Sequence, residues 1–421
     1  MKILNKLALL LAFSIASTSI QAADSLRVLF IGNSYTYVNN LPQLVASFAA
    51  ATGDFVYFAS NTPGGYTLQQ HSSNTTSTSL IAQGKWNFVV LQEQSQLPAF
   101  PDAQVQNDVF PYARMLDSMI KASDSCTKTL FYMTWGRKNG DQANCSFFPP
   151  LCTYQGMDSM LQLRYTMMAD SNKGVISPVA KVWRKIRDTY PAMNLYDNDE
   201  SHPSLLGSYA AAVTFYTVMF KKSPIGNTYD GGLSASDAAT IRQVVKQMVY
   251  DSLAVCYRFY PKLKAGFNFN SSNDTVSFQN TSANGFTYQW TFGDGSSSTQ
   301  KSPIHKYATS GNYTVKLIAK RCNTTDTVIK AVNVVKLGIE NLETSHQVKV
   351  VPNPAKESIQ LHAAYPIQSV RIVSLMGQTM RTFNSNGSTN MHCSLIGLQT
   401  GVYVVMVRTK EGEFHSRLVV E

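Results

Sequence analysis

Short apolar runs alternate with amphipathic stretches from Ser25 to about Tyr260. Such runs predict β-strands, and they lie at 26–31, 55–59, 88–91, 129–134 and 193–196. The stretches between them carry apolar residues at helical spacing, and the clearest predicted helices are 42–51, 154–169, 204–220 and 234–254. Strands that alternate with helices are typical of an α/β layer fold with a mainly parallel sheet. We predict such a domain at 23–260.

The pattern changes after Pro261. Short alternating strands, many Asn, Ser and Thr residues and frequent turn signals predict a small β-sandwich at 262–336. A second β-rich module follows at 345–421, with alternating stretches such as 370–373 and 402–407. The predicted fold class is therefore an α/β domain followed by two small β-sandwich domains.

The first residues of the chain differ from the rest. Lys2 and Lys6 precede an apolar run, and a small-residue cleavage site lies at Ala22, as in a secretory signal peptide. The alternative is a membrane anchor, but the run is shorter than the about 20 apolar residues that span a bilayer. We expect an exported chain whose signal peptide is 1–22.

Charge and cysteine content restrict the function further. The formal net charge of +10 comes from Lys and Arg residues that are scattered along the chain, so nucleic acid is not expected as a partner. Six cysteines in an exported chain can form disulfides, and the spacing of Cys145 and Cys152 suggests a local bridge. The remaining cysteines show no readable pairing: Cys126, Cys256, Cys322 and Cys393. Neither C-x-x-C nor H-E-x-x-H occurs, so we expect no metal site and no cofactor.

Two polar blocks carry candidate chemistry. The first predicted strand ends in Gly32-Asn33-Ser34, which places a serine at the carboxyl end of a parallel strand, where α/β sheets form their ligand crevice. A serine becomes a strong nucleophile when an imidazole takes its proton and a carboxylate orients that imidazole. The segment 197–204 contains both, in Asp199 and His202. Ser34, Asp199 and His202 are therefore the candidate catalytic residues.

His71 is a second candidate for the base. Of the seven histidines, only His71 and His202 fall in the predicted α/β domain. No carboxylate lies near His71 in the sequence, so His202 is the better candidate. His71 is then expected either to line the crevice or to lie on the surface.

The two blocks together resemble the SGNH (GDSL-like) hydrolase family, which has its nucleophile in a G-D-S or G-N-S block and its base in a D-x-x-H block. Gly32-Asn33-Ser34 and Asp199-Glu200-Ser201-His202 match both blocks in the right order. Residues 64–68, 91–95 and 134–136 are further similar to an uncharacterised exported branch of this family. The resemblance implies a three-layer, flavodoxin-like hydrolase domain with serine esterase activity.

The family stabilises its oxyanion with the nucleophile's own amide, a glycine amide and an asparagine side chain. Ser34 supplies the first donor, and Gly64 or Gly65 fits the second. The asparagine block is missing after the third predicted strand, where Gln92 and Gln94 stand instead, on the same side of the chain if the strand continues. Either glutamine amide is a candidate donor, and the choice stays open.

The two β modules also resemble known families. The run from Tyr288 to Gly295, with Trp290-Thr291-Phe292-Gly293-Asp294 at its centre, is similar to a PKD domain, which implies a spacer or a weak glycan contact. Pro352-Asn353-Pro354 and Gly401-Val402-Tyr403 resemble the C-terminal sorting domain of type IX secretion. That resemblance implies the type IX secretion machinery as a partner. It also implies a secreted or surface protein of a Gram-negative bacterium, exported through the periplasm.

The sequence thus predicts a secreted serine esterase that removes short acyl groups, acetyl groups above all, from a carbohydrate through an acyl-serine intermediate. The glycan preference rests on secretion and on the accessory β domains rather than on the site. A lipase or thioesterase of the same fold stays open, because no sequence feature defines the acyl pocket. The third alternative is a non-catalytic cell-surface protein that binds glycan.

Overall fold

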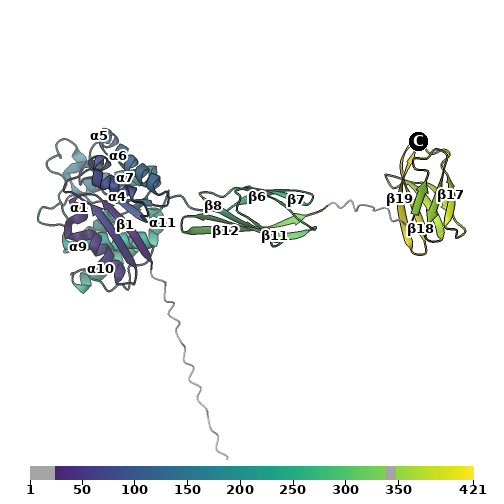
Figure 1. The fold of residues 1–421 in the computed structure, drawn as a ribbon. Helices are drawn as coiled ribbons and strands as arrows, with labels where there is room; N and C mark the ends of the chain where they lie inside the picture. Colours follow the sequence, from purple (N-terminus) through teal and green to yellow (C-terminus); the bar gives the residue numbers. More distant parts are fainter. Residues whose placement is uncertain (1–23, 337–347) are drawn as a thin grey trace, which may run out of the picture.

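The chain folds into three units that follow one another along the sequence (Figure 1). Each unit has its own hydrophobic core. The structure is a computed structural model and describes residues 24–336 and 348–421, so the predicted signal peptide 1–22 lies outside the described residues. The first core belongs to an α/β domain and the other two belong to antiparallel β units. The fold class that the sequence predicts is confirmed.

A five-stranded parallel sheet forms the centre of the α/β domain. Its strand order is β2-β1-β3-β4-β5, the order of flavodoxin-like folds. The strands are β1 (Ser25–Ile31), β2 (Phe55–Asn61), β3 (Phe88–Leu91), β4 (Lys128–Tyr132) and β5 (Val175–Ser177). β3 is apolar and buried along its whole length, as expected for a strand covered on both faces. Ile31 pairs with Leu91, so the carboxyl ends of β1 and β3 lie side by side.

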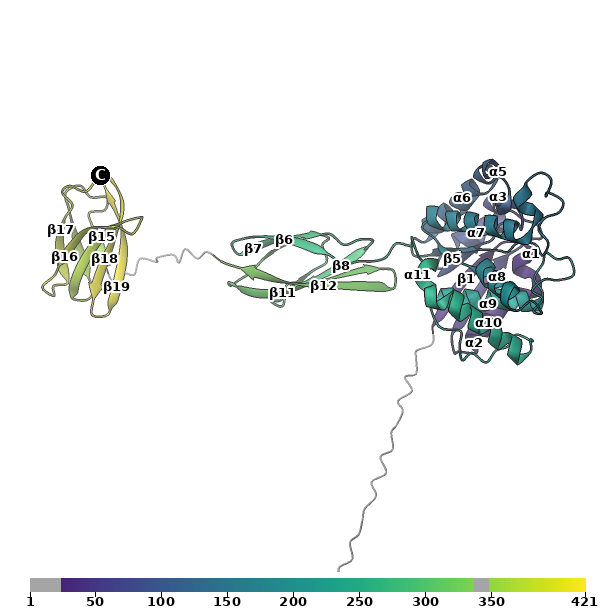
Figure 2. The ribbon, with the colours of Figure 1, turned by 180° about the vertical axis from the view of Figure 1, so that it is seen from behind.

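Helices cover both faces of this sheet (Figures 1 and 2). One layer contains α2 (Leu41–Ala50), α8 (Val179–Thr189), α9 (Leu205–Phe220) and α10 (Ala235–Met248). The opposite layer contains α3 (Leu68–Ser73), α4 (Thr75–Ala82), α5 (Asp102–Asp108), α6 (Phe110–Ser123) and α7 (Tyr154–Ser171). The remaining segments are short: α1 (Ser34–Tyr37), α11 (Leu253–Cys256) and 3₁₀ turns at Val38–Asn40, Leu97–Ala99, Pro149–Cys152 and Tyr250–Ser252.

The strand predicted at 193–196 was wrong. In the described part of the chain, Tyr196 forms only an isolated bridge with Pro203, and the fifth strand of the sheet is Val175–Ser177. That strand is three residues long and directly follows α7. Its apolar run is therefore too short to stand out from the helix before it.

The helix predicted at 234–254 also differs from the structure. Its start is as expected, because the Ser234 hydroxyl caps α10 by accepting a hydrogen bond from the Asp237 amide at 3.1 Å. The helix ends at Met248, however, because Val249 has a φ of −121° and ψ of −56° and leaves the helical region. A separate turn and α11 then complete the segment.

Two antiparallel sheets form the first β unit, with strand orders β10-β7-β6 and β12-β11-β8-β9. The strands are β6 (Phe267–Ser272), β7 (Thr275–Asn280), β8 (Thr287–Thr291), β9 (Ser297–Ser298), β10 (Ile304–Lys306), β11 (Gly311–Arg321) and β12 (Thr324–Val334). Trp290 and Phe292 are buried in the core of this unit. They stabilise the sandwich and do not offer a platform for a sugar.

The second β unit is also a sandwich of two antiparallel sheets, with orders β13-β14-β17 and β16-β15-β18-β19. The strands are β13 (Val348–Val351), β14 (Ser358–Ala363), β15 (Ile367–Ser374), β16 (Thr379–Asn384), β17 (Asn390–Ser394), β18 (Gly401–Thr409) and β19 (Gly412–Val420). Its core is separate from that of the α/β domain.

Two disulfides are present in the described residues. Cys145 pairs with Cys152, so the local bridge suggested by the sequence is confirmed. Cys126, between α6 and β4, pairs with Cys322 at the turn between β11 and β12. This second bridge joins the α/β domain to the first β unit. The sequence did not reveal it, because 196 positions separate the two cysteines.

Candidate active site

The segment after β1 forms a tight turn that presents Ser34 at the start of α1. Asn33 caps this helix, since its side-chain oxygen accepts from the Tyr35 amide at 3.2 Å and its side-chain nitrogen donates to the Tyr66 carbonyl at 2.8 Å. A Cβ at Gly32 would lie 2.6 Å from Oε1 of Gln92, so a larger residue does not fit there. The turn is therefore held in place from both sides of Ser34.

The structure brings Ser34, His202 and Asp199 into one hydrogen-bonded line. Nε2 of His202 lies 2.8 Å from Oγ of Ser34. The other ring nitrogen, Nδ1, is hydrogen-bonded to Oδ2 of Asp199. Since the carboxylate only accepts, Nδ1 carries the proton and Nε2 is left as the acceptor for the serine hydroxyl. This is the protonation state that a general base requires.

Internal hydrogen bonds fix the loop that carries Asp199 and His202. Oδ1 of Asp199 accepts from the amides of Ser201 and His202 at 3.0 and 2.9 Å, and Glu200 adopts a left-handed conformation with φ of 60°. Partial burial acts to raise the pKa of Asp199, but the hydrogen bonds from the His202 ring and from these two amides outweigh it and lower the pKa below its ordinary value. The carboxylate therefore stays ionised.

An aromatic stack contacts this loop through Ser201. Tyr35 stacks on Trp135 with ring centroids 5.0 Å apart, and Trp135 stacks on Trp183 at 3.6 Å. The Tyr35 hydroxyl is 2.7 Å from Oγ of Ser201, and the Trp135 indole donates to the Ser201 carbonyl at 3.2 Å. The ring of Tyr35 also meets His202 edge-on. The position of the imidazole is thus set by a rigid core as well as by Asp199.

Ser34 and His202 open into a pocket of about 430 Å³. Its lining residues come from the segments that follow β1, β2, β3 and β4 and from the loop before α9: Asn33, Ser34, Tyr35, Gly65, Gln94, Ser95, Arg137, Asp199, Ser201 and His202. None of them is aliphatic. The pocket is therefore polar and suits a hydrophilic substrate.

The lining of the pocket distinguishes between the candidate oxyanion donors. Gly65 and Gln94 line it together with Ser34, whereas Gly64 and Gln92 do not. Gln92 is fully buried, and its Oε1 accepts from the Asn33 amide at 2.8 Å, so it supports the serine turn from behind. The sequence placed Gln92 and Gln94 on the same side of the chain only if the third strand continued through them. β3 ends at Leu91, before both glutamines, so that condition is not met.

His71 lies neither in the pocket nor on the surface, so both expectations for its position were wrong. It is fully buried, with Nε2 2.8 Å from the Gly32 carbonyl and Nδ1 2.7 Å from Oγ of Ser77. Because a carbonyl only accepts, Nε2 of His71 carries a proton. Burial lowers its pKa, although the bond to Gly32 acts in the opposite direction. His71 therefore supports the nucleophile turn and has no path to the Ser34 hydroxyl.

Arg137 and Glu93 are site features that the sequence reasoning missed. Arg137 lines the pocket and pairs with the buried Asp141 at 3.0 Å, while it also donates to the side chain of Gln96. Glu93 is buried behind Gln94 and accepts from the amides of Gln94 at 2.7 Å and Leu68 at 3.0 Å. Arg137 directly follows the segment 134–136, and Glu93 lies within the segment 91–95, both of which the sequence singled out. Their position at the carboxyl edge of the sheet was therefore the available signal.

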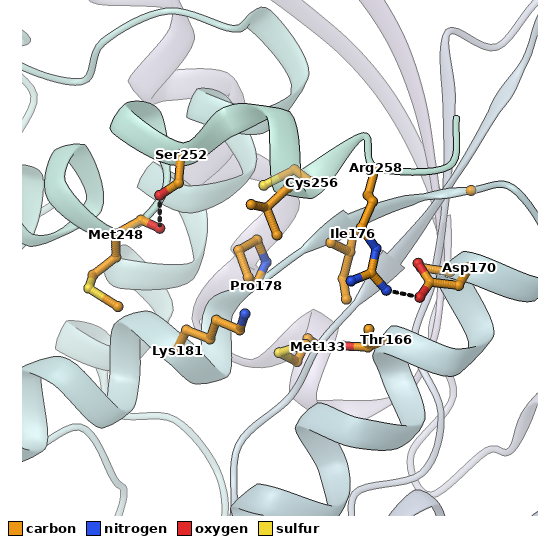
Figure 3. Close-up of a pocket in the computed structure, with 13 residues that line it drawn as sticks. Met133, Thr166, Asp170, Ile176, Pro178, Lys181, Met248, Ser252, Cys256 and Arg258 are labelled. Carbon is orange, nitrogen blue, oxygen red and sulfur yellow. Dashed lines mark hydrogen bonds and ion pairs between the residues drawn. The ribbon is translucent and has the colours of Figure 1, made fainter. Parts of the chain in front are cut away.

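A second cavity of about 240 Å³ lies between α7, β5, α8 and α11 (Figure 3). Lys181, Cys256 and the ion pair of Arg258 with Asp170 line it. Burial raises the pKa of the Cys256 thiol to about 12. The thiol stays protonated at neutral pH, so this cavity contains no activated nucleophile. Across the described ranges, no three His, Cys, Asp or Glu side chains gather as a metal site would require.

Family models match both β units. Residues 261–335 match the PKD domain, and residues 349–421 match the secretion system C-terminal sorting domain. The sorting domain marks the chain as a secreted or cell-surface protein. Among the helices of the described residues, none is both long and apolar enough to cross a membrane.

Solved structures similar to the chain include a protein of Slackia heliotrinireducens that is proposed to be an SGNH hydrolase. It is 23% identical over 47% of this chain and 100% of its own length, with a TM-score of 0.40. A DUF4886 family protein from Bacteroides uniformis is 17% identical over 56% of this chain and 96% of its own, with a TM-score of 0.47. The PKD1 domain of a Vibrio cholerae metalloprotease is 30% identical over 18% of this chain and 98% of its own, with a TM-score of 0.17. No curated protein matches the chain.

Proposed function

We propose that the α/β domain is a serine esterase with Ser34 as nucleophile, His202 as general base and Asp199 as the residue that orients the base. The observation that carries this proposal is the continuous line of hydrogen bonds from the Ser34 hydroxyl through both nitrogens of His202 to Asp199. The line opens into a polar pocket, where a substrate can reach the hydroxyl. Such a line converts a weak nucleophile into an effective one.

The reaction follows from these contacts. Oγ of Ser34 bonds to the carbonyl carbon of the ester while its proton passes to Nε2 of His202, and Asp199 stabilises the imidazolium. The tetrahedral intermediate then breaks its bond to the alcohol oxygen, which takes the proton from His202 and leaves. Water attacks the resulting acyl-serine with His202 again as base. This step releases the carboxylic acid and restores the Ser34 hydroxyl.

Three donors are proposed for the oxyanion: the Ser34 amide, the Gly65 amide and the Gln94 side chain. Oε1 of Gln94 accepts from the amides of Gln96 and Leu97 at 3.0 and 3.1 Å. Its Nε2 is therefore turned the other way and donates one long hydrogen bond, at 3.4 Å, to Oγ of Ser95. The second hydrogen of this amide can donate to a developing negative charge, which contributes about 3 kcal/mol to the stabilisation of the transition state.

The pocket supports a short acyl group on a carbohydrate as the substrate. No aliphatic side chain lines it, so it offers no apolar channel for the long chain of a lipid or thioester substrate. Gln94, Ser95 and Arg137 instead present polar groups that suit sugar hydroxyls. An acetyl group is short enough to meet these requirements, so acetylated glycans are the proposed substrates.

The proposed location of this activity is the outside of a Gram-negative cell. A C-terminal sorting domain directs a chain to secretion machinery, here of type IX, after the chain has entered the periplasm. A secreted enzyme at the cell surface meets extracellular and envelope polysaccharides. This location agrees with a carbohydrate ester as substrate and gives the PKD domain the role of a spacer.

The decisive experiment is labelling with a fluorophosphonate probe, which reacts with activated serines. We expect the wild-type protein to be labelled at Ser34 and the Ser34→Ala and His202→Ala variants to remain unlabelled. Absence of labelling in the folded wild-type protein would favour a non-catalytic glycan-binding protein. A series of p-nitrophenyl esters from acetate to octanoate, with acetylated xylan as the glycan substrate, then defines the acyl group. Faster turnover of the octanoate ester than of the acetate ester would contradict the proposal and indicate a lipase.

A further inference from the structure

Another cleft, distinct from the cavity of Figure 3, lies at the opposite end of the parallel sheet from Ser34. Its volume is about 690 Å³, within the range of small-molecule sites. One wall is made by the amino ends of the strands, with Leu26 at the start of β1, Phe88 at the start of β3 and Lys128 at the start of β4. The other wall is the turn between β11 and β12 of the PKD domain, from Arg321 to Asp326. We name this space the junction cleft.

Positive charge gathers in the junction cleft. Five cationic residues line it: Lys85, Lys128, Lys221, Lys262 and Arg321. Within the described residues, none of these five forms an ion pair with a carboxylate. The two acidic residues of the lining, Asp124 and Asp326, instead accept hydrogen bonds from backbone amides at 2.8 and 2.7 Å.

The cations lie close to one another and to aromatic rings. Burial lowers the pKa of Lys128, and the positive charges of Lys221 and Arg321 lower it further. Nζ of Lys128 lies 5.1 Å from the ring centre of Phe88 and 5.8 Å from that of Tyr260. Nε of Arg321 is buried without a hydrogen-bond partner in the described chain. The cleft thus has excess positive charge.

A covalent link fixes the two walls of the cleft. Cys126, in the loop that leads to Lys128, is bonded to Cys322, which directly follows Arg321. The guanidinium and the ammonium group are therefore held on the same side of the domain junction. A site built from two domains usually changes when the domains move, but here the disulfide restricts that motion.

We propose that the junction cleft binds an acidic saccharide unit, with its carboxylate or sulfate group held by Lys128, Lys221 and Arg321. An anion in this position removes the mutual repulsion of the cations. The aromatic and aliphatic parts of the lining are suited to the apolar face of a sugar ring. The sorting domain directs the chain to the outside of the cell, where acidic polysaccharides occur. A duplex nucleic acid fits less well, because these cations gather in one cleft at the domain junction and not along an extended surface.

The inference does not depend on the reaction at Ser34, since the junction cleft lies at the amino ends of the strands. It gives the enzyme a second point of attachment to an acidic polymer whose ester groups would be cleaved at the carboxyl ends. The two functions can therefore be tested separately. Binding should be unchanged in a protein that lacks the nucleophile.

The test measures binding by isothermal titration calorimetry to the mature chain with Ser34→Ala, which prevents any hydrolysis. Polygalacturonate is the carboxylated probe, dextran sulfate the sulfated probe and dextran the neutral control. We expect binding to one or both acidic polymers and none to dextran. The triple variant Lys128→Gln/Lys221→Gln/Arg321→Gln should bind at least about tenfold more weakly, since each charge-assisted contact contributes to affinity. The two acidic probes tell a carboxylate site from a sulfate site.

The matched control removes the same charge elsewhere, as Lys301→Gln/Lys356→Gln/Lys410→Gln, from three exposed positions in the two β units. This variant should bind within about twofold of the parent, because exposed and distant charges contribute little. Thermal unfolding of both triple variants checks that the fold is intact. Equal weakening in both triple variants, binding of dextran, stronger binding to duplex DNA than to the acidic glycans, or no binding to either acidic polymer would overturn the proposal.

Discussion

The Nε2 atom of His202 lies 2.8 Å from the Ser34 hydroxyl, although 168 positions separate the two residues in the sequence. Ser34 ends the turn after β1, and His202 precedes α9 in the loop that packs over the same edge of the sheet. The aromatic stack of Tyr35 and Trp135 ties the two segments together through Ser201. The proposed catalytic pair is thus a product of the fold and not of one local motif.

The first prediction concerns this pair. Ser34→Ala and His202→Ala should each reduce kcat on a short-chain ester by about 10⁴-fold or more, because either change breaks the same proton-transfer unit. The double variant should cost little more than either single change. Thermal unfolding should be similar in all of them, since both side chains are partly exposed. Additive losses in the double variant would show that the two residues do not act together.

The second prediction separates the two glutamines. Gln94→Ala should lower kcat by about 10²- to 10³-fold with little change in stability, because it removes one oxyanion donor. Gln92→Ala should instead destabilise the fold by about 1–3 kcal/mol, since the Asn33 amide and the Thr36 hydroxyl lose a buried acceptor. The measurements are steady-state kinetics and thermal unfolding of both variants. The reverse pattern would assign the donor to Gln92.

Much of the fold and the candidate site is readable from the sequence because the signals are local. Ser34 follows an apolar strand, and Asp199 and His202 share one short loop, so each block can be recognised from its own residues. The resemblance to the SGNH family then relates the two blocks to each other. The apolar run 88–91 coincides with β3 because a strand buried on both faces must be apolar throughout.

The features that sequence reasoning missed depend on contacts between distant segments. His71 has its partner, the Gly32 carbonyl, 39 positions away, and nothing beside His71 reveals it. The lysines and arginines look scattered along the chain, yet the amino ends of the strands and one turn of the PKD domain bring Lys128 and Arg321 into the same cleft. The bridge from Cys126 to Cys322 was hidden for the same reason.

The third prediction follows from the separate cores. Deletion of the chain from Leu337 onward should leave the protein in the periplasm with an unchanged kcat, because the sorting domain is lost while the α/β core is intact. Cell fractionation and an ester assay on each fraction measure both effects. Full-length Ser34→Ala serves as the control and should be exported normally. Export of the truncated chain at the normal level would contradict the assigned role of residues 349–421.

The fourth prediction concerns pH and His71. Its folded pKa lies below the ordinary value of 6.5, so in the folded state it binds fewer protons than in the unfolded state just below that pH. The free energy of unfolding should therefore fall as the pH decreases through 6.5. His71→Gln, which cannot take up a proton, should lack this part of the pH dependence, although it is less stable than the wild type at pH 8. Parallel unfolding profiles for the two proteins between pH 5 and 8 would show that His71 titrates normally.

The last prediction concerns Glu93, the fully buried carboxyl group behind Gln94. Burial raises its pKa to about 8, although the amides of Gln94 and Leu68 donate to it and act to lower the pKa. A folded pKa above the ordinary value of 4.5 means that the folded state retains a proton that the unfolded chain has lost.

The stability due to Glu93 is therefore complete below pH 4.5 and is lost as the pH rises through about 8. Glu93→Gln keeps an oxygen that can accept from both amides but does not titrate. The melting temperature of the wild-type protein should decrease more between pH 5 and 9 than that of Glu93→Gln, and the variant should be the more stable of the two at pH 9. Asp188→Asn, at an exposed position of α8, is the matched control and should follow the wild type. If Glu93→Gln instead followed the wild type across the whole range, the carboxylate would be ionised throughout, and the amides of Gln94 and Leu68 would outweigh its burial.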